Sequence, residues 1–104
     1  MKIYISGGIT GVKNYKERFA RAAAIIEEKG HEAINPCDIQ AIFKPGTTSW
    51  EQYMMVDKGM LQACAAVYFL PGWEKSKGSR IEHKWAIEFG LKIYTALEAI
   101  RRAK

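Results

Sequence analysis

Short apolar runs alternate with helical patterns along the whole chain, and this alternation constrains the fold more than any other feature. Runs rich in β-branched and aromatic residues predict strands at residues 2–6, 31–34, 65–70 and 91–94. Apolar residues three or four apart predict helices between Asn14 and Gly30, from Ser49 to Cys64, from Ser79 to Phe89, and from Ala96 to Lys104. Strands that alternate with helices imply a parallel sheet covered by helices on both faces.

A chain of 104 residues can form one domain around one modest core. We therefore expect a single α/β domain over residues 1–104, a flavodoxin/Rossmann-like three-layer sandwich. Right-handed crossovers favour a parallel sheet of four or five strands in the order 2-1-3-4. In such a sheet, ligands bind at the carboxyl ends of the first and third strands, where the strand order reverses.

Three loops are candidates for ligand binding. Gly7-Gly8-Ile9-Thr10-Gly11 follows the first strand, and Pro71 to His83 leads from the third strand into a helix. Glycines in such turns let the backbone approach a ligand closely, although a plain turn is an equal alternative for the first loop. The segment from Cys37 to Thr48 has no clear pattern, and we expect a lid or a binding loop there.

Capping signals mark the predicted helix starts. A Ser or Asn followed three residues later by Glu or Gln predicts a capping box, in which both side chains accept hydrogen bonds from backbone N–H groups. Three such pairs occur: Asn14 with Glu17, Ser49 with Gln52, and Ser79 with Glu82. We expect Gly30 and Gly90 to end two of the helices.

Composition argues against several classes of protein. The net charge is +5, but the basic residues alternate with Glu and do not interleave with aromatic residues, so nucleic-acid binding is not expected. Cys37 and Cys64 lack metal-ligand spacing, and no GxGxxG motif occurs, so we expect neither a metal nor a cofactor. No segment has the length of a membrane span or the pattern of a signal peptide, so we expect a cytoplasmic protein.

Two carboxylates are the candidates for chemistry at the carboxyl ends of the strands. Asp57 falls on the apolar stripe of Met54 and Leu61, and an acid on a buried face is costly unless it is hydrogen-bonded or paired. Glu82 lies in the first turn of the helix predicted from Ser79. Two carboxyls in different environments can divide the cleavage of a glycosidic bond, one as nucleophile and one as proton donor and acceptor. Both also have structural alternatives, since Glu82 could complete a capping box and Asp57 could bind a backbone amide.

Other side chains could support these carboxylates. Tyr4, on the first strand, could orient Glu82 by hydrogen bonding. Ser76, Gly78, Ser79 and the amides that open the following helix could hold a phosphate, because a helix N-terminus favours anions. The nearby lysines and arginines could add positive charge, or could simply be solvated.

Several motifs together resemble a known family. They are Tyr4-Ile5-Ser6-Gly7, Asn35-Pro36, Trp50-Glu51-Gln52-Tyr53-Met54 with Asp57, Leu70-Pro71-Gly72-Trp73-Glu74, and Ser76-Lys77-Gly78 with Glu82. The pattern resembles small domains of phages and bacteria that are grouped with the nucleoside 2-deoxyribosyltransferases and are related to the 2'-deoxynucleoside 5'-monophosphate N-hydrolases. The resemblance extends from about Met1 to Ile93.

The resemblance implies a role for each matching residue. Glu82 would attack C1' of the deoxyribose, Asp57 would support the nucleophile and proton transfer, and Tyr4 would orient Glu82. A serine at the position of Ser76 is typical of the monophosphate hydrolases, where it binds the 5'-phosphate. The substrate-binding residues that we expect are Ser6, Gly7, Gly8, Ile9, Asn35, Ser76, Gly78 and Ser79.

The resemblance implies cleavage or transfer at the N-glycosidic bond of a 2'-deoxynucleoside or its 5'-monophosphate, through a covalent glutamyl-deoxyribosyl intermediate. It also implies a homodimer or a higher homo-oligomer. The chain has Ala65 where related sequences usually have Asp, and Gly8 where they often have Pro. We expect the missing Asp to remove a contact to sugar or to a transferred proton. A protein that binds nucleotides without turnover, as a sensor or sequestering protein, is the alternative.

Overall fold

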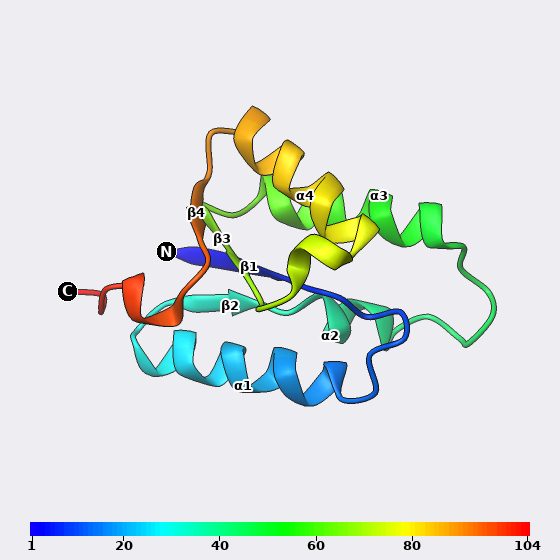
Figure 1. Ribbon diagram of the computed structural model, residues 1–104, viewed down its shortest axis with the longest axis horizontal. Helices are drawn as coiled ribbons and strands as arrows, with labels where there is room; N and C mark the ends of the chain where they lie inside the picture. Colours follow the sequence, from blue (N-terminus) through cyan, green and yellow to red (C-terminus); the bar gives the residue numbers. More distant parts are fainter.

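Four parallel strands form one sheet at the centre of the protein. The computed structural model describes residues 1–104, and the strands lie in the order β2-β1-β3-β4 (Figure 1). Their bounds are Lys2–Ser6 for β1, Glu32–Ile34 for β2, Ala66–Phe69 for β3 and Lys92–Tyr94 for β4. The predicted α/β fold and the strand order 2-1-3-4 are therefore confirmed.

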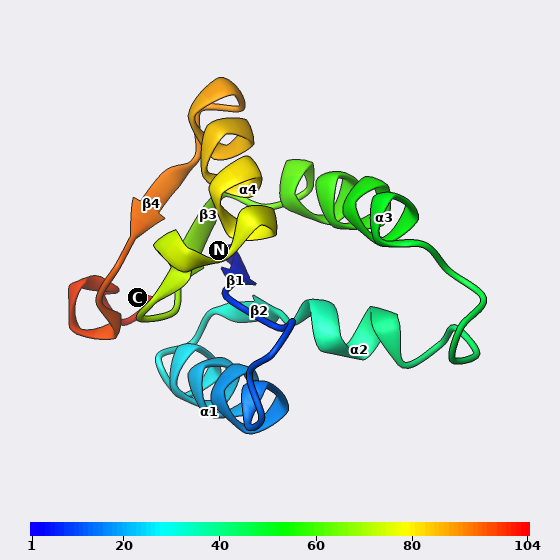
Figure 2. The ribbon, with the colours of Figure 1, turned by 45° about the vertical axis from the view of Figure 1, so that its right-hand side comes forward.

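Helices cover both faces of this sheet (Figures 1 and 2). On one face, α1 (Tyr15–Glu28) packs on Ile3 and Ile5. On the other face, α3 (Trp50–Gln62) and α4 (Lys77–Glu88) pack on Tyr4, Val67 and Phe69. Side chains alternate between the two faces along each strand, which is why neighbouring residues of β1 belong to different cores. No helix is both long enough and apolar enough to span a membrane.

The helix starts agree only in part with the predicted capping boxes. Ser49 and Gln52 form a complete box at the start of α3, with N–H···O distances of 3.1 Å and 2.8 Å. Asn14 stands before α1, but its side chain makes no capping hydrogen bond. The predicted start at Ser79 is wrong, because α4 begins at Lys77 and is capped by the hydroxyl of Ser76.

The segment predicted as a loop from Cys37 contains a short helix. This helix, α2 (Pro36–Gln40), has Asn35 as its N-cap, and the Asn35 side chain accepts a hydrogen bond from the N–H of Cys37 at 3.0 Å. Proline suits the first position of a helix, since the N–H that it lacks would have no partner there. Residues 41–48 form turns and bends, in agreement with a loop.

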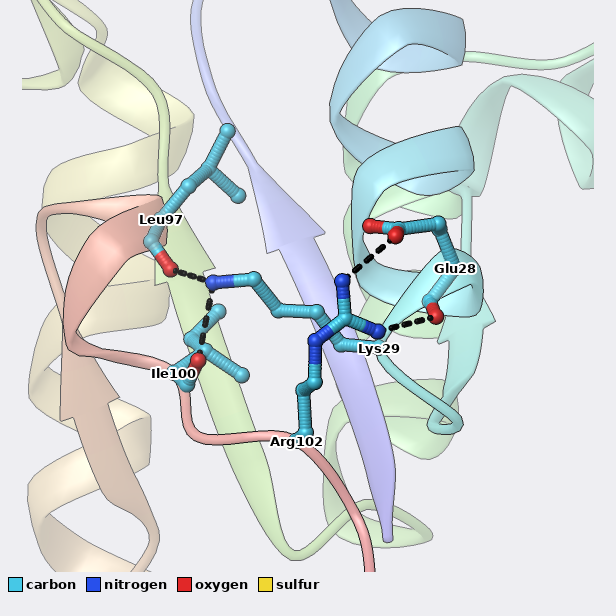
Figure 3. A network of polar contacts seen from close by, with 5 residues as sticks. All are labelled: Glu28, Lys29, Leu97, Ile100 and Arg102. Atoms are coloured by element: carbon cyan, nitrogen blue, oxygen red, sulfur yellow. Dashed lines mark hydrogen bonds and ion pairs between the residues drawn. The ribbon is translucent and has the colours of Figure 1, made fainter.

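The helix predicted from Ala96 to Lys104 is wrong. Only Leu97–Ala99 forms a short 3-10 turn, and the chain then runs across the C-terminal end of α1 (Figure 3). The ammonium group of Lys29 donates hydrogen bonds to the carbonyls of Leu97 and Ile100. Ile100 is buried, and the N–H of Ala103 donates to the carbonyl of Lys29. These contacts hold the terminal segment in a non-helical path.

Substitution of Lys29 by Met is expected to lower the free energy of unfolding by about 1–2 kcal/mol, because two partly buried carbonyls lose a charged donor. Urea denaturation followed by circular dichroism measures this change. The exposed Lys84 of α4, which makes no side-chain hydrogen bond or ion pair, provides the matched control Lys84→Met. Equal stabilities of the two variants would contradict the role given to Lys29.

Candidate active site

A cavity of about 910 Å³ opens at the carboxyl ends of β1 and β3. It is bounded by the loop after β1, by the N-terminal halves of α3 and α4, and by the loop between β3 and α4. This is the place where the strand order reverses and where sheets of this kind bind ligands. The cavity is therefore the candidate active site.

Glu82 lies at the wall of this cavity with only 5 % of its surface exposed. It belongs to the inward face of α4, together with Ser79 and Ala86. The hydroxyl of Tyr4 donates a hydrogen bond to Oε2 of Glu82 at 2.6 Å, and the hydroxyl of Ser6 donates to Oε1 at 2.6 Å. Both carboxylate oxygens thus accept from β1, and the alternative of Glu82 as a helix cap is wrong.

The period of the strand explains this arrangement. Tyr4 and Ser6 are two residues apart on β1, so their side chains point to the same face of the sheet. That face is the one covered by α3 and α4. The carboxyl group of Glu82 lies between the two hydroxyls and is fixed at both oxygens.

Asp57 contributes a second carboxyl group from α3. It is 8 % exposed, lies on the same helix face as Met54 and Leu61, and lines the cavity. No backbone amide acts on the Asp57 carboxylate, so the alternative of a structural acid bonded to a backbone amide does not hold. The carboxyl group of Asp57 faces the place where a ligand would bind.

Burial changes the titration of all three groups. It raises the pKa of Glu82 to about 7, against the opposing effect of the hydrogen bonds from Ser6 and Tyr4, and the charge of Asp57 adds to the increase. Burial raises the pKa of Asp57 to about 6, and the Tyr4 hydroxyl acts in the opposite direction. Burial and the two carboxylates raise the pKa of Tyr4 well above its usual value, so Tyr4 remains a hydrogen-bond donor. Near neutral pH the two carboxyls can therefore share one proton.

The start of α4 offers hydrogen-bond donors to an anion. Ser76 lines the cavity, and its oxygen accepts a hydrogen bond from the N–H of Ser79 at 3.2 Å, so that this amide is already engaged. The amides of Lys77 and Gly78, at the first two helical positions, have no partner inside the helix. The cations that line the cavity are Arg18, Lys75 and Lys77.

Most of the residues predicted to bind substrate line the cavity. They are Ser6, Gly7, Gly8, Ile9, Ser76, Gly78 and Ser79. Gly7 has a close neighbour, since a Cβ atom there would lie 2.6 Å from Cδ1 of Leu70. Asn35 does not line the cavity, because its side chain caps α2.

Ala65 lies at the opposite end of the sheet from the cavity. Its N–H donates to the carbonyl of Lys2, the first residue of β1, and its carbonyl accepts from Lys92, the first residue of β4. It is exposed and does not line the cavity. The expectation that Ala65 removes a contact to sugar or to a transferred proton is therefore wrong.

Several lining residues were not predicted from the sequence. Trp50 is 40 % exposed at the cavity, where the ammonium group of Lys77 lies 4.8 Å from its ring centroid. Tyr53 and Arg18 also line it, and Arg18 donates a hydrogen bond to the carbonyl of Pro71 at 2.6 Å. The position of Trp50 in the first turn of α3 was a usable signal, since the N-termini of helices that precede and follow β3 face the same end of the sheet.

Solved structures with the same fold include two deoxyribosyltransferases and one glycosidase. The 2-deoxyribosyltransferase of Bacillus psychrosaccharolyticus is 15 % identical over 89 % of this chain and 69 % of its own, with a TM-score of 0.70. The CMP N-glycosidase BcmB of Clostridium botulinum is 23 % identical over 89 % of this chain and 66 % of its own (TM-score 0.60). The 2-desoxiribosyltransferase of Leishmania mexicana is 21 % identical over 88 % of this chain and 61 % of its own (TM-score 0.64).

These similarities show that the chain has the fold of nucleoside deoxyribosyltransferases. The chain spans less than two thirds of the length of the glycosidase and of the Leishmania protein. No curated protein matches the sequence significantly. One family does match, over residues 1–95, and its description is "Domain of unknown function (DUF4406)". Because the match covers most of the chain, the protein belongs to the DUF4406 family.

Proposed function

We propose that the protein cleaves or transfers at the N-glycosidic bond of a 2'-deoxynucleoside or its 5'-monophosphate. The observation that carries this proposal is the buried Glu82 carboxylate, fixed by Tyr4 and Ser6 at the wall of a large cavity beside the second carboxyl group of Asp57. Two carboxyls of this kind can divide nucleophilic attack and proton transfer between them. The solved proteins of the same fold are named as enzymes of this chemistry, which supports the proposal.

The reacting form is the one in which Glu82 is ionised and the single proton of the pair lies on Asp57. It is the less populated singly protonated form of the free protein, since the pKa of Glu82 is higher than that of Asp57. In the first step, an oxygen of ionised Glu82 attacks C1' of the sugar. The bond from C1' to the base nitrogen breaks, its electron pair leaves with the base, and protonated Asp57 gives its proton to the base. In the second step, water or the nitrogen of another base attacks C1' and breaks the ester bond to Glu82. Ionised Asp57 takes the proton of the attacking group, so both carboxyls return to their first state.

The cations and free amides near Ser76 support a phosphorylated substrate. A phosphate at this place could accept hydrogen bonds from the amides of Lys77 and Gly78 and from the hydroxyl of Ser76. Arg18 and Lys75 add positive charge to the same cavity. The Clostridium botulinum protein is named as a glycosidase of CMP, a nucleotide. We therefore expect 5'-monophosphates to be better substrates than nucleosides.

Incubation with a panel of deoxynucleosides, deoxynucleoside monophosphates and their ribose counterparts tests the proposal, with the free base measured by chromatography. Release from a deoxynucleoside or its monophosphate supports it, and a second base added to the mixture distinguishes transfer from hydrolysis. Binding of nucleotides by calorimetry without release from any substrate would overturn it and favour the non-catalytic nucleotide-binding protein.

Substitution of Asp57 by Asn is expected to lower kcat by about 100-fold with little change in KM, because the leaving base loses its proton donor. The loss should shrink for a substrate whose base leaves readily without protonation. Steady-state kinetics on the best substrate of the panel measure both effects. Asp38, which is exposed on α2, provides the control Asp38→Asn. A loss of equal size for all bases would contradict proton donation by Asp57.

A further inference from the structure

Behind Glu82 lies a pair of buried serines that substrate binding does not explain. Ser6 and Ser79 are each 1 % exposed. Their hydroxyl oxygens are hydrogen-bonded to each other at 2.9 Å, and Ser6 is at 2.6 Å from Oε1 of Glu82. Three side chains from two elements therefore form one continuous chain of hydrogen bonds, in the order Ser79, Ser6, Glu82.

The number of hydroxyl hydrogens determines the direction of this chain. A serine hydroxyl has one hydrogen to donate and two lone pairs that accept. When Glu82 is ionised, it can only accept, so Ser6 donates to it. Ser6 then has no hydrogen left for Ser79, and Ser79 must donate to Ser6. The hydroxyls of both serines are thus committed to the carboxylate.

We propose that Ser6 is a positioning residue for the Glu82 carboxylate and that Ser79 orients the hydroxyl of Ser6, so that neither hydroxyl contacts the substrate. This differs from the substrate-binding role expected from the sequence. Its consequence for turnover rests on the proposed function, whereas its consequence for the free protein does not. Ser79 suits this role because its backbone N–H is held by Ser76 and its side chain lies one helical turn before Glu82, on the same face of α4.

The surroundings of Glu82 make Ser6 one of only two donors to it. The groups that face Glu82 are Tyr4 and Ser6 from β1, Asp57 from α3 and Ser79 from its own helix. No cation bonds to the carboxylate, although Arg18, Lys75 and Lys77 line the same cavity. Loss of Ser6 would therefore leave Tyr4 as the single donor that stabilises the charge on Glu82.

Loss of the hydrogen bond from Ser6 makes the Glu82 carboxyl harder to ionise. A hydrogen bond to a carboxylate favours its ionised form, so removal of the bond makes ionisation harder. Ser6→Ala is expected to move the titration of Glu82 to higher pH by about one unit, the size typical of a hydrogen bond to a charged group. Ser79→Ala should move it in the same direction by less, because Ser6 can still donate.

Titration of the free protein tests this without any substrate. Carbon-13 NMR of the labelled side-chain carboxyls follows Glu82, whose signal is assigned by its loss in Glu82→Gln. The double variant Ser6→Ala/Ser79→Ala should titrate like Ser6→Ala alone, because Ser79 acts only through Ser6. An unchanged midpoint in Ser6→Ala, or additive shifts in the double variant, would overturn the proposal.

Kinetics provide the second arm. With active protein, the limb of the kcat/KM profile that depends on Glu82 should move up with the NMR midpoint, while KM on the plateau stays the same. A raised KM with an unmoved limb would show that Ser6 contacts substrate and would overturn the proposal. If no substrate of the panel is cleaved, the proposed function fails, but the NMR arm still decides the role of Ser6.

Ser49→Ala is a control for a loss of stability, and Ser79→Ala takes the place of Ser6→Ala if that variant does not fold. Ser49→Ala removes a serine cap from α3 and should lower stability without moving the titration of Glu82. If Ser6→Ala does not fold, Ser79→Ala alone decides the matter. Its upward shift supports the proposal, and an unmoved titration overturns it.

Discussion

Substitution of Glu82 by Gln is expected to lower the rate of base release by about 10⁴-fold or more, the largest effect of any single substitution in the chain. Gln keeps the size of the side chain and can still accept a hydrogen bond from Tyr4 or Ser6, but its amide cannot form the ester bond to C1'. The loss should therefore appear in kcat, with substrate binding largely kept.

Free base measured over long incubations with excess substrate gives the residual rate, and calorimetry gives the affinity. Glu88, which is exposed on the same helix, provides the matched control Glu88→Gln with unchanged kinetics. Base release by Glu82→Gln within tenfold of the native rate would exclude Glu82 as the nucleophile.

The same variant is expected to be more stable than the native protein at alkaline pH. The pKa of Glu82 is raised from its usual 4.5 to about 7 because the side chain is buried. Between these two values the folded protein binds more protons than the unfolded chain, so stability falls as the pH rises. Gln does not titrate, and Glu82→Gln should therefore gain about 2–3 kcal/mol over the native protein between about pH 4.5 and pH 8.

Urea denaturation at several pH values measures this difference. The free energies of unfolding of the two proteins should diverge through this range and run parallel above it. Glu88→Gln should show no such divergence, since Glu88 is exposed. If the difference in free energy of unfolding between Glu82→Gln and the native protein does not change with pH, folding does not raise the pKa of Glu82. The expected gain would show that this buried carboxylate is kept at a cost to stability.

The parts of the fold that were predicted correctly follow from strong local signals. The strand Lys2–Ser6 matches its predicted bounds because β-branched and aromatic residues alternate and glycines follow. The box of Ser49 and Gln52 defines the start of α3, and the apolar stripe of that helix correctly placed Asp57 on the buried face. An acid on an apolar stripe was thus the most informative single residue for the site.

Other parts depend on tertiary contacts that have no local signal. Ala96 to Lys104 is rich in helix-forming residues, but nine residues are too few for a stable isolated helix, and Lys29 binds the carbonyls of this segment instead. Ser76 and Ser79 are both suitable caps in the sequence. Only the packing of α4 shows that Ser79 points inward to Ser6, and that Glu82 is therefore free of capping.

The lining of the cavity was the least predictable part of the site. The spacing of Trp50, Met54 and Asp57 on one stripe predicts burial, but it cannot distinguish contact with the core from contact with a cavity. Asn35 shows the opposite case, since the Asn-Pro pair has a structural use as the cap and first residue of α2. Composition around a loop indicates where a site lies, whereas its walls depend on the packing of separate elements.

A covalent intermediate on Glu82 tests the central claim most directly. Native protein is mixed with its best deoxynucleotide, quenched in acid within the first turnover, digested, and examined by mass spectrometry. We predict that the peptide containing Glu82 gains the mass of one deoxyribosyl phosphate, that the ester is on Glu82, and that Glu82→Gln gains none. Rapid base release with no added mass on this peptide, or with the adduct on another residue, would contradict the account.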